Sequence, residues 1–328
     1  MRPEVGGVER VARELAARLP RLRPERYRVL RPPVALAFRA GHLWEQLALP
    51  LAARSARLVL SPANLAPLAL GDRNVVVIHD VAALRHPDAY GGFYAAYQRR
   101  LLPTLAQRAA LVLTVSEFSK RELVELLGVA PERVEVVPNG VGERFGPAAD
   151  PAPARNRYAL GRPYVLAVGT ASARKNLAAL GEAAERLARV GAELVVAGSG
   201  RGYLRGGESP PGRPLGYVDD ELLPSLYAGA SALVVPSLHE GFGLPALEAM
   251  ASGVPVVAAD RGGLPEACGE AALLVEPDPA ALAWALERVL DDEELRARLR
   301  RSGLERAPAF SWQRSAERTD ALVSGLLG

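Results

Sequence analysis

The sequence predicts an α/β protein made of two doubly wound, Rossmann-like units. Short apolar runs alternate with helical patterns along the whole chain, which favours parallel sheets covered by helices. A Pro/Ala/Gly-rich stretch without a sustained hydrophobic period divides the chain near its middle. At 328 residues and 49% apolar composition, the chain is longer than one hydrophobic core usually organises. We therefore expect two domains.

In each half, four apolar runs predict strands, and helical patterns lie between them. The first-half strands are RLVLS, NVVVIHD, ALVLTVS and RVEVVPN, at residues 57–61, 74–80, 110–116 and 133–139. The first-half helices are expected at residues 8–19, 42–54, 91–108 and 117–127. The second-half strands are YVLAVGT, ELVVAGS, ALVVPS and VPVVAAD, at residues 164–170, 193–199, 232–237 and 254–260.

These elements divide the chain into four parts. We expect a first domain at residues 1–145, a linker at 146–163 and a second domain at 164–310. Residues 311–328 begin with a Ser cap and continue with helical spacing, which predicts a final helix.

Composition excludes several classes of protein. No apolar run reaches the roughly 18 residues that would span a bilayer, because arginines interrupt each one. The start has no apolar segment typical of a signal peptide. A single cysteine, Cys268, excludes a multi-cysteine zinc site and suits a reducing cytoplasm. Nucleic acid is not an expected partner, because no basic stripe is interleaved with aromatic residues.

Charge is unevenly divided along the chain. Residues 1–145 carry 21 basic and 14 acidic residues, although the whole chain has a net charge of only +3. A basic first half suits anionic lipid headgroups or an acidic acceptor. The alternative interpretation is that arginine is the general surface cation of this chain, since 38 of its 40 basic residues are arginine. The two lysines are Lys120 and Lys175.

Residues that directly follow strands are the first candidates for a functional site, because ligands of open parallel sheets bind outside the carboxyl ends of the strands. Arg174 and Lys175 follow the strand at 164–170, and HEGFGLPALEAM follows the strand at 232–237. A glycine turn before a helix brings backbone N–H groups close to an anion, and two cations add full positive charge. This combination suits a diphosphate, while Glu240 and Glu248 could accept hydrogen bonds from sugar hydroxyls.

Each candidate also has a structural interpretation. Glu248 could be a helix-surface carboxylate, and Glu240 an ordinary loop charge. Arg174 and Lys175 could belong to a solvated helix end. His79, which ends the strand at 74–80, could be a satisfied buried histidine. Residues alone leave these alternatives open.

The stretch SLHEGFGLPALEAMASGVPVVAADRGGLPEACGEAALLVEP resembles the retaining GT-B glycosyltransferases of family 4, in which two glutamates are separated by seven residues. Glu240 and Glu248 match those glutamates. The resemblance continues through VGTASARKNL, GYVDDELLPSLYAGASALVVPS, VIHDVAALRHPDAY, LTVSEFSKREL, VEVVPNGV and GGVERVARELA, and so covers nearly the whole chain.

The resemblance implies a role for each matched residue. The second domain would bind a nucleotide-diphosphate sugar, with Glu248 on the ribose and Glu240 on the transferred sugar. The backbone amides of Gly241, Phe242 and Gly243 would contact the sugar or phosphate. Arg174 and Lys175 would neutralise the diphosphate. The base would bind at Val218 and Pro236. In the first, acceptor-binding domain, His79 would lie near the reacting face of the sugar, and Gly6 and Gly7 match the amino-terminal glycine loop. The last helix would cross back onto this domain.

The resemblance also implies the chemistry and its setting. A hexose would be transferred with retention of anomeric configuration, without a cofactor and without an obligatory metal, because cations and a helix dipole stabilise the diphosphate. GDP-mannose is the favoured donor and UDP-glucose the next. The acceptor would be a glycan or lipid-linked molecule in cell-surface polysaccharide or glycolipid synthesis. The enzyme would be cytoplasmic, at the inner face of the plasma membrane and in peripheral contact with it.

Two departures and three alternatives accompany this interpretation. Thr170 follows Gly169 where family members commonly have arginine, and only MRPEV precedes Gly6 where a first strand is expected. A dinucleotide-dependent oxidoreductase is disfavoured because the glycines at 198, 200 and 202 are followed by Tyr203, which breaks the G-x-G-x-x-G pattern. A glycosidase would need its two carboxylates to act as acid and base. A non-catalytic or truncated binding protein of the same fold remains the third alternative.

Overall fold

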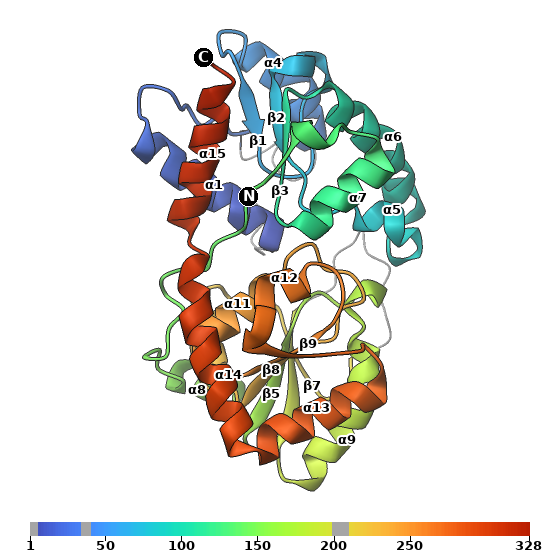
Figure 1. Cartoon of the computed structure of the whole chain (residues 1–328), viewed down its shortest axis with the longest axis vertical. Coiled ribbons are helices and arrows are strands. Elements are labelled where there is room, and N and C mark those ends of the chain that lie inside the picture. Colours follow the sequence, from blue (N-terminus) through green and yellow to red (C-terminus); the bar gives the residue numbers. More distant parts are fainter. Residues whose placement is uncertain (1–5, 34–40, 199–209) are drawn as a thin grey trace. The chain divides into compact units, whose positions relative to one another are not determined.

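The computed structural model describes residues 6–33, 41–198 and 210–328 (Figure 1). The chain forms two compact units. Unit 1 comprises Met1–Arg85, Ala95–Gly140 and Trp312–Gly328, and unit 2 comprises His86–Tyr94 and Val141–Ser311. The final helix therefore belongs to unit 1, as the sequence predicts.

The described part of unit 1 contains a parallel sheet whose strands lie in chain order, β1-β2-β3-β4. The strands are β1 (Val59–Ser61), β2 (Asn74–Val77), β3 (Leu111–Thr114) and β4 (Val134–Val136). The longer helices are α1 (Gly7–Leu22), α6 (Gly92–Arg108), α7 (Glu117–Leu127) and α15 (Trp312–Gly325). The shorter turns are α3 (Gly41–Leu43), η1 (Trp44–Ala48), α4 (Leu49–Ala52), η2 (Leu68–Arg73), α5 (Ala82–Arg85) and η4 (Pro131–Arg133).

Local sequence signals explain where the unit 1 helices begin and end. The Ser116 side chain accepts a hydrogen bond from the Ser119 amide at the start of α7, and Gly128 ends that helix in the left-handed conformation. The strands β2 and β3 are buried along their whole length, because helices cover both faces of the sheet. Helix α15 packs beside α1, and the Arg318 side chain pairs with Glu135 next to β4.

Unit 2 contains a six-stranded parallel sheet with the order β10-β9-β8-β5-β6-β7. The strands are β5 (Tyr164–Val168), β6 (Glu193–Ala197), β7 (Arg213–Gly216), β8 (Ala232–Val235), β9 (Val256–Ala259) and β10 (Ala272–Val275). From β5 the chain adds β6 and β7 on one side, then returns to add β8, β9 and β10 on the other. Strand order therefore reverses between β5 and β8, which pair at Val165↔Ala232 and Leu166↔Leu233.

Helices surround this second sheet (Figure 1). The longer ones are α8 (Ala152–Tyr158), α9 (Gly181–Arg189), α10 (Leu223–Ala228), α11 (Leu244–Ala251), α12 (Leu264–Cys268), α13 (Pro279–Asp291) and α14 (Glu293–Arg306). The 3-10 turns are η3 (Pro87–Ala89), η5 (Ala173–Lys175), η6 (Leu177–Leu180), η7 (Gly269–Ala271) and η8 (Ala307–Ala309). Asp278 and Asp292 cap α13 and α14 by accepting backbone N–H bonds.

The predicted class of two doubly wound units is confirmed, with differences at the edges. Strands β7 and β10 were not predicted; each pairs with one neighbour, and β7 has the sequence RPLG, which lacks an apolar run. The stretch 146–163, expected to be a linker, holds α8, whose Ala154 amide donates to the Ser225 hydroxyl on α10. Residues 1–5, where the absence of a first strand was noted, lie outside the described residues. So do positions 200, 202 and 203 of the glycine pattern.

Across the described ranges, no helix combines the length and the apolar character needed to cross a bilayer.

Candidate functional site

The loops after β5 and β8 meet at the point where the strand order of unit 2 reverses. In open α/β sheets this switch point, outside the carboxyl ends of the strands, is where ligands bind. The Leu238 amide donates a 2.8 Å hydrogen bond to the Arg174 carbonyl, which fixes one loop to the other. Arg174, Lys175 and Glu240, all expected site residues, are thereby brought together.

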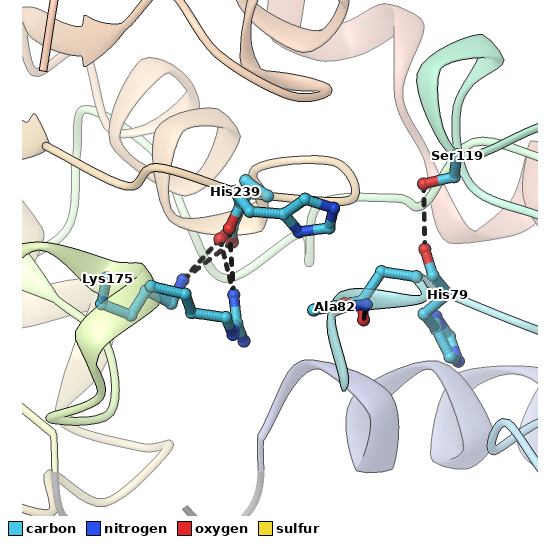
Figure 2. Close-up of polar contacts among 8 residues, drawn as sticks. His79, Ala82, Ser119, Lys175 and His239 are labelled. Carbon is cyan, nitrogen blue, oxygen red and sulfur yellow. Dashed lines mark hydrogen bonds and ion pairs between the residues drawn. The ribbon is translucent and has the colours of Figure 1, made fainter. Parts of the chain in front are cut away.

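Two cations converge on the Glu240 carboxylate. Lys175 Nζ lies 2.8 Å from both Oε1 and Oε2 of Glu240, and Arg174 donates to Oε2 at 3.2 Å. Figure 2 shows these contacts around Lys175 as dashed lines. Lys175 is 8% exposed and Glu240 is 9% exposed, so water screens the three charges weakly. Two positive charges against one negative charge leave the cluster with a formal excess of one positive charge. We name Arg174, Lys175 and Glu240 the switch-point cluster.

Two glycines on the loop after β9 pack directly against the backbone of Glu240. The Gly263 amide donates a 2.7 Å bond to the Glu240 carbonyl. Gly262 has φ +65, and a Cβ added there would lie 2.5 Å from that same carbonyl oxygen. A Cβ at Gly263 would lie 2.4 Å from the Gly241 carbonyl oxygen. Side chains at either position are therefore excluded, and close backbone contact sets the orientation of Glu240.

Asn176 fixes the turn that carries the two cations, but not as a helix cap. Its side chain makes no cap hydrogen bond to η6 and instead donates to the carbonyls of Pro236, at 3.1 Å, and Pro277, at 2.8 Å. Its φ of +53 is one that asparagine tolerates better than most residues. In this conformation the side chain reaches the loops that follow β8 and β10. The carboxyl ends of β5 and β8 are thus fastened together.

Glu248 lies on α11 and is 3% exposed. Its Oε2 accepts a 2.9 Å hydrogen bond from the Tyr227 hydroxyl on α10. The Tyr227 ring is itself fully buried, with Phe145 packed edge-on at 5.6 Å between ring centroids. Glu248 is therefore not a solvated helix-surface carboxylate, and Tyr227 orients it.

The remaining expected residues of unit 2 are also buried. Gly241 and Gly243 flank Phe242, and Gly243 directly precedes the first turn of α11. The Phe242 ring packs against Phe310 at 5.6 Å. Pro236 follows β8, and Val218, which is 4% exposed, follows β7.

His79 follows β2 in unit 1 and is 6% exposed. Its amide donates to Asn64 Oδ1 at 2.8 Å, and its carbonyl accepts from the Ser119 hydroxyl at 3.1 Å (Figure 2). The ring atom Nε2 lies 3.0 Å from the Pro62 carbonyl, which can only accept, so Nε2 carries the proton. Burial lowers the pKa of His79, and the Pro62 carbonyl, Asp80 and Glu9 oppose this shift. The imidazole is therefore neutral at pH 7, and Nδ1 is the acceptor.

Gly6 and Gly7 begin α1 in the same unit. The Gly6 amide donates to Glu9 Oε2 at 3.2 Å, which satisfies one of the free amides of the first turn. Glu9 also raises the pKa of His79, so the start of α1 and the end of β2 are electrostatic neighbours.

Sequence reasoning missed five residues of this site. Four of them are Tyr227, Asn176 as a clamp, and the pair Gly262 and Gly263. The RGG sequence after β9 was the available signal for the glycines, while nothing in the spacing of Tyr227 pointed to Glu248. His239 was also missed; it precedes Glu240, is 2% exposed, and its ring lies 5.3 Å from that of His86 in an edge-to-face arrangement. No cluster of three or more potential metal ligands occurs within the described segments.

Two parallel α/β units, one with a cationic cluster at its topological switch point, place the chain among the GT-B glycosyltransferases. Residues 162–292 match the family model described as "Glycosyl transferases group 1", and residues 24–144 match the model "Glycosyltransferase Family 4". The chain belongs to this family of glycosyltransferases, and it is an enzyme of that class.

Named relatives agree with this membership, and a solved structure shares the fold. The chain is 34% identical to O-antigen chain mannosyltransferase B of Escherichia coli, over 76% of this chain and 69% of the relative. It is 38% identical to D-inositol 3-phosphate glycosyltransferase of Acidothermus cellulolyticus, over 77% of this chain and 60% of the relative. The structure of HepE from Anabaena with UDP-glucose has a TM-score of 0.79 at 20% identity, covering 99% of this chain and 98% of HepE. The chain spans less than two thirds of the second relative's length.

Proposed function

We propose that this glycosyltransferase is a retaining hexosyltransferase that uses a nucleotide-diphosphate sugar as donor. The acceptor is a glycan or lipid-linked molecule in cell-surface polysaccharide or glycolipid synthesis. The observation that carries the proposal is the switch-point cluster, in which Lys175 and Arg174 hold an excess positive charge at the carboxyl ends of β5 and β8. The non-catalytic alternative is not favoured, because the named relatives are enzymes.

In this reaction the bond between the anomeric carbon and the diphosphate oxygen breaks, and its electron pair leaves with the nucleoside diphosphate. The acceptor oxygen forms the new bond to the anomeric carbon, and the acceptor hydroxyl proton passes to the departing diphosphate. Lys175 and Arg174 stabilise the negative charge that develops on the leaving group, and burial strengthens this effect. Glu240 holds both cations in place and uses remaining lone pairs for hydroxyls of the transferred sugar.

Glu248 is the proposed ligand of the donor ribose. A carboxylate accepts two sugar hydroxyls, and Tyr227 already fixes the orientation of Oε2. The Gly241, Phe242 and Gly243 amides address the sugar or phosphate, and Val218 and Pro236 line the base pocket. His79 is the proposed residue at the reacting face of the transferred sugar, and Gly6 and Gly7 are the proposed glycine loop of the acceptor domain.

The proposed donor is GDP-mannose, with UDP-glucose as the second choice. Similarity to the Escherichia coli mannosyltransferase supports a mannose donor. We further propose that no metal is obligatory, because the switch-point cluster supplies the charge that a divalent ion would otherwise bring. Undiminished turnover in excess EDTA is the expected result.

The proposed place of action is the cytoplasmic face of the plasma membrane, with peripheral contact to anionic lipid. The relative that builds an O-antigen chain and the basic excess of residues 1–145 support this location.

The decisive experiment is a thermal-shift screen with GDP, UDP, ADP and dTDP, followed by turnover assays with the matching nucleotide sugars. A nucleotide at 100 times its Kd should stabilise the protein by about 2.7 kcal/mol. GDP is expected to give the largest shift. Lys175→Ala and Glu248→Ala should abolish turnover while the protein stays folded, and Lys120→Ala, the matched lysine control, should leave it intact. Turnover that survives both site substitutions would sink the assignment.

A further inference from the structure

A small cavity lies inside unit 1, where α1 and α15 pack beside each other (Figure 1). Apolar side chains from α1, β2 and β3 form much of its wall, and the polar residues that line it are Asn139, Trp312, Ser315 and Thr319. Its volume is about 10 Å³. A cavity needs about 10–15 Å³ to hold one water molecule, so this one has room for a single water. We name it the α15 cavity.

Trp312 brings a hydrogen-bond donor to the wall of this cavity. It is the first residue of α15 and is 2% exposed. Among the residues that the structure describes, its Nε1 atom has no hydrogen-bond partner. An indole N–H can only donate, and a buried donor without an acceptor loses the hydrogen bond that it makes with water in the unfolded chain. Because buried polar groups are almost always paired, we expect an acceptor for Trp312 inside the cavity.

Two hydroxyl groups on the same helix complement this donor. The Ser315 hydroxyl donates to the Pro138 carbonyl, and the Thr319 hydroxyl donates a 2.7 Å bond to the Ser315 carbonyl. A carbonyl oxygen only accepts, so each hydroxyl uses its single proton in these bonds. Both hydroxyl oxygens keep lone pairs and can only accept a further hydrogen bond.

We propose that the α15 cavity binds one ordered water molecule. The water accepts from Trp312 Nε1 and donates its two protons to the hydroxyl oxygens of Ser315 and Thr319. The Asn139 side chain, which can donate as well as accept, is the group available to the remaining lone pair of the water. Buried waters typically make about three hydrogen bonds to protein groups, whereas cavities that stay dry have apolar walls.

The role of this water is to attach the first turns of α15 to the segment that follows β4. Asn139 lies one residue before Gly140, where one stretch of unit 1 ends, and Trp312 is the residue at which the next stretch begins. The bond from Ser315 to Pro138 already joins these two segments directly. The water adds a second polar connection at the same place. This inference concerns unit 1 alone and does not depend on the proposed donor site in unit 2.

NMR of the full chain labelled with 15N-tryptophan tests the proposal. The chain has three tryptophans, Trp44, Trp284 and Trp312, so three indole N–H signals are expected, and Trp312→Phe identifies one of them. A water that stays bound for longer than the protein takes to tumble gives NOE and ROE cross-peaks of opposite sign, whereas proton exchange gives the same sign in both. Trp312 should show the opposite-sign pair. Trp284, which is 51% exposed, should not. Absence of the opposite-sign pair at Trp312 overturns the proposal.

Filling the cavity gives a second measurement. Val115 lines the cavity and is 2% exposed, and Val115→Ile adds one methylene group there. This variant should lose the opposite-sign pair at Trp312, and its thermal midpoint should not rise, because the Trp312 donor is left without its acceptor. Val112→Ile is the matched control, since Val112 is buried in β3 outside the cavity wall, and it should keep the pair.

Two results with Val115→Ile would overturn the proposal. A higher thermal midpoint than that of the wild type is the result expected when a dry cavity is filled. Persistence of the opposite-sign pair would place the water outside the α15 cavity.

Discussion

Lys175 Nζ lies 2.8 Å from each carboxylate oxygen of Glu240, and both side chains are almost completely buried. A buried pair of this geometry compensates the loss of hydration only if each charge keeps its partner. Arg174 supplies a second cation at 3.2 Å, so the Glu240 carboxylate would keep one partner if Lys175 were removed. The switch-point cluster is therefore protected against the loss of a single cation.

Stability measurements on two variants should show this protection. Lys175→Ala should lower the free energy of unfolding by about 1–3 kcal/mol, whereas removing both cations should reach the roughly 3–5 kcal/mol typical of a broken buried pair. Urea denaturation of Lys175→Ala and of the double variant with Arg174→Ala provides the comparison. Lys120→Ala should change stability by less than about 0.5 kcal/mol. Equal losses in the single and double variants would contradict the shared carboxylate.

Tyr227→Phe should separate stability from donor binding. The substitution removes the hydrogen bond to Glu248 Oε2, and loss of such a buried bond typically costs about 1–3 kcal/mol. We expect weaker GDP binding, because Glu248 loses the group that orients it. Calorimetric titration with GDP measures the effect.

Tyr164→Phe is the matched control for that experiment. Tyr164 is also fully buried, and its hydroxyl donates a 2.6 Å bond to the Leu226 carbonyl rather than to a carboxylate. This variant should lose comparable stability and keep the GDP affinity of the wild type. If both variants lost affinity equally, Tyr227 would be a structural residue only.

The neutral His79 should make unit 1 sensitive to acid. Because its folded pKa lies below the ordinary value of 6.5, its stabilising contribution is complete above about pH 6.5 and is lost as pH falls toward the folded pKa. The loss is at most about 1.4 kcal/mol per pH unit. His79→Gln should flatten the dependence of unfolding free energy on pH below about 6.5. A wild-type NMR titration showing His79 protonated at pH 6.5 would refute the neutral form.

Glu45→Gln should stabilise the protein at alkaline pH. Burial raises the folded pKa of Glu45 to about 7, so the unfolded chain ionises first and wild-type stability falls as pH rises from about 4.5 through 7. The difference in pKa corresponds to at most about 3 kcal/mol. In thermal denaturation, the variant should be more stable than the wild type at pH 8 and equally stable at pH 4. A constant difference across that range would exclude titration as the cause.

The interior strands were predictable because each carries a continuous apolar run. NVVVIHD and ALVLTVS became the central strands β2 and β3. The edge strand β7 was not predicted, because RPLG has no such run and β7 forms where β6 offers it unpaired backbone groups.

The candidate site was partly predictable for a different reason. A cation after one strand and a carboxylate after another could be proposed from sequence, since both follow carboxyl ends. Their direct contact required the reversal of strand order between β5 and β8, which local sequence does not specify. Tyr227 could not be found at all, because its contact with Glu248 depends on how α10 packs against α11.

The two glycines behind Glu240 also limit how this enzyme can be redesigned. Any residue other than glycine at position 262 or 263 would push a carbon atom into the main chain of residues 240 and 241. Libraries that aim to change the sugar accepted should therefore leave positions 262 and 263 constant. Variation belongs in side chains that reach the ligand, and the glycine pair is better treated as a fixed part of the scaffold.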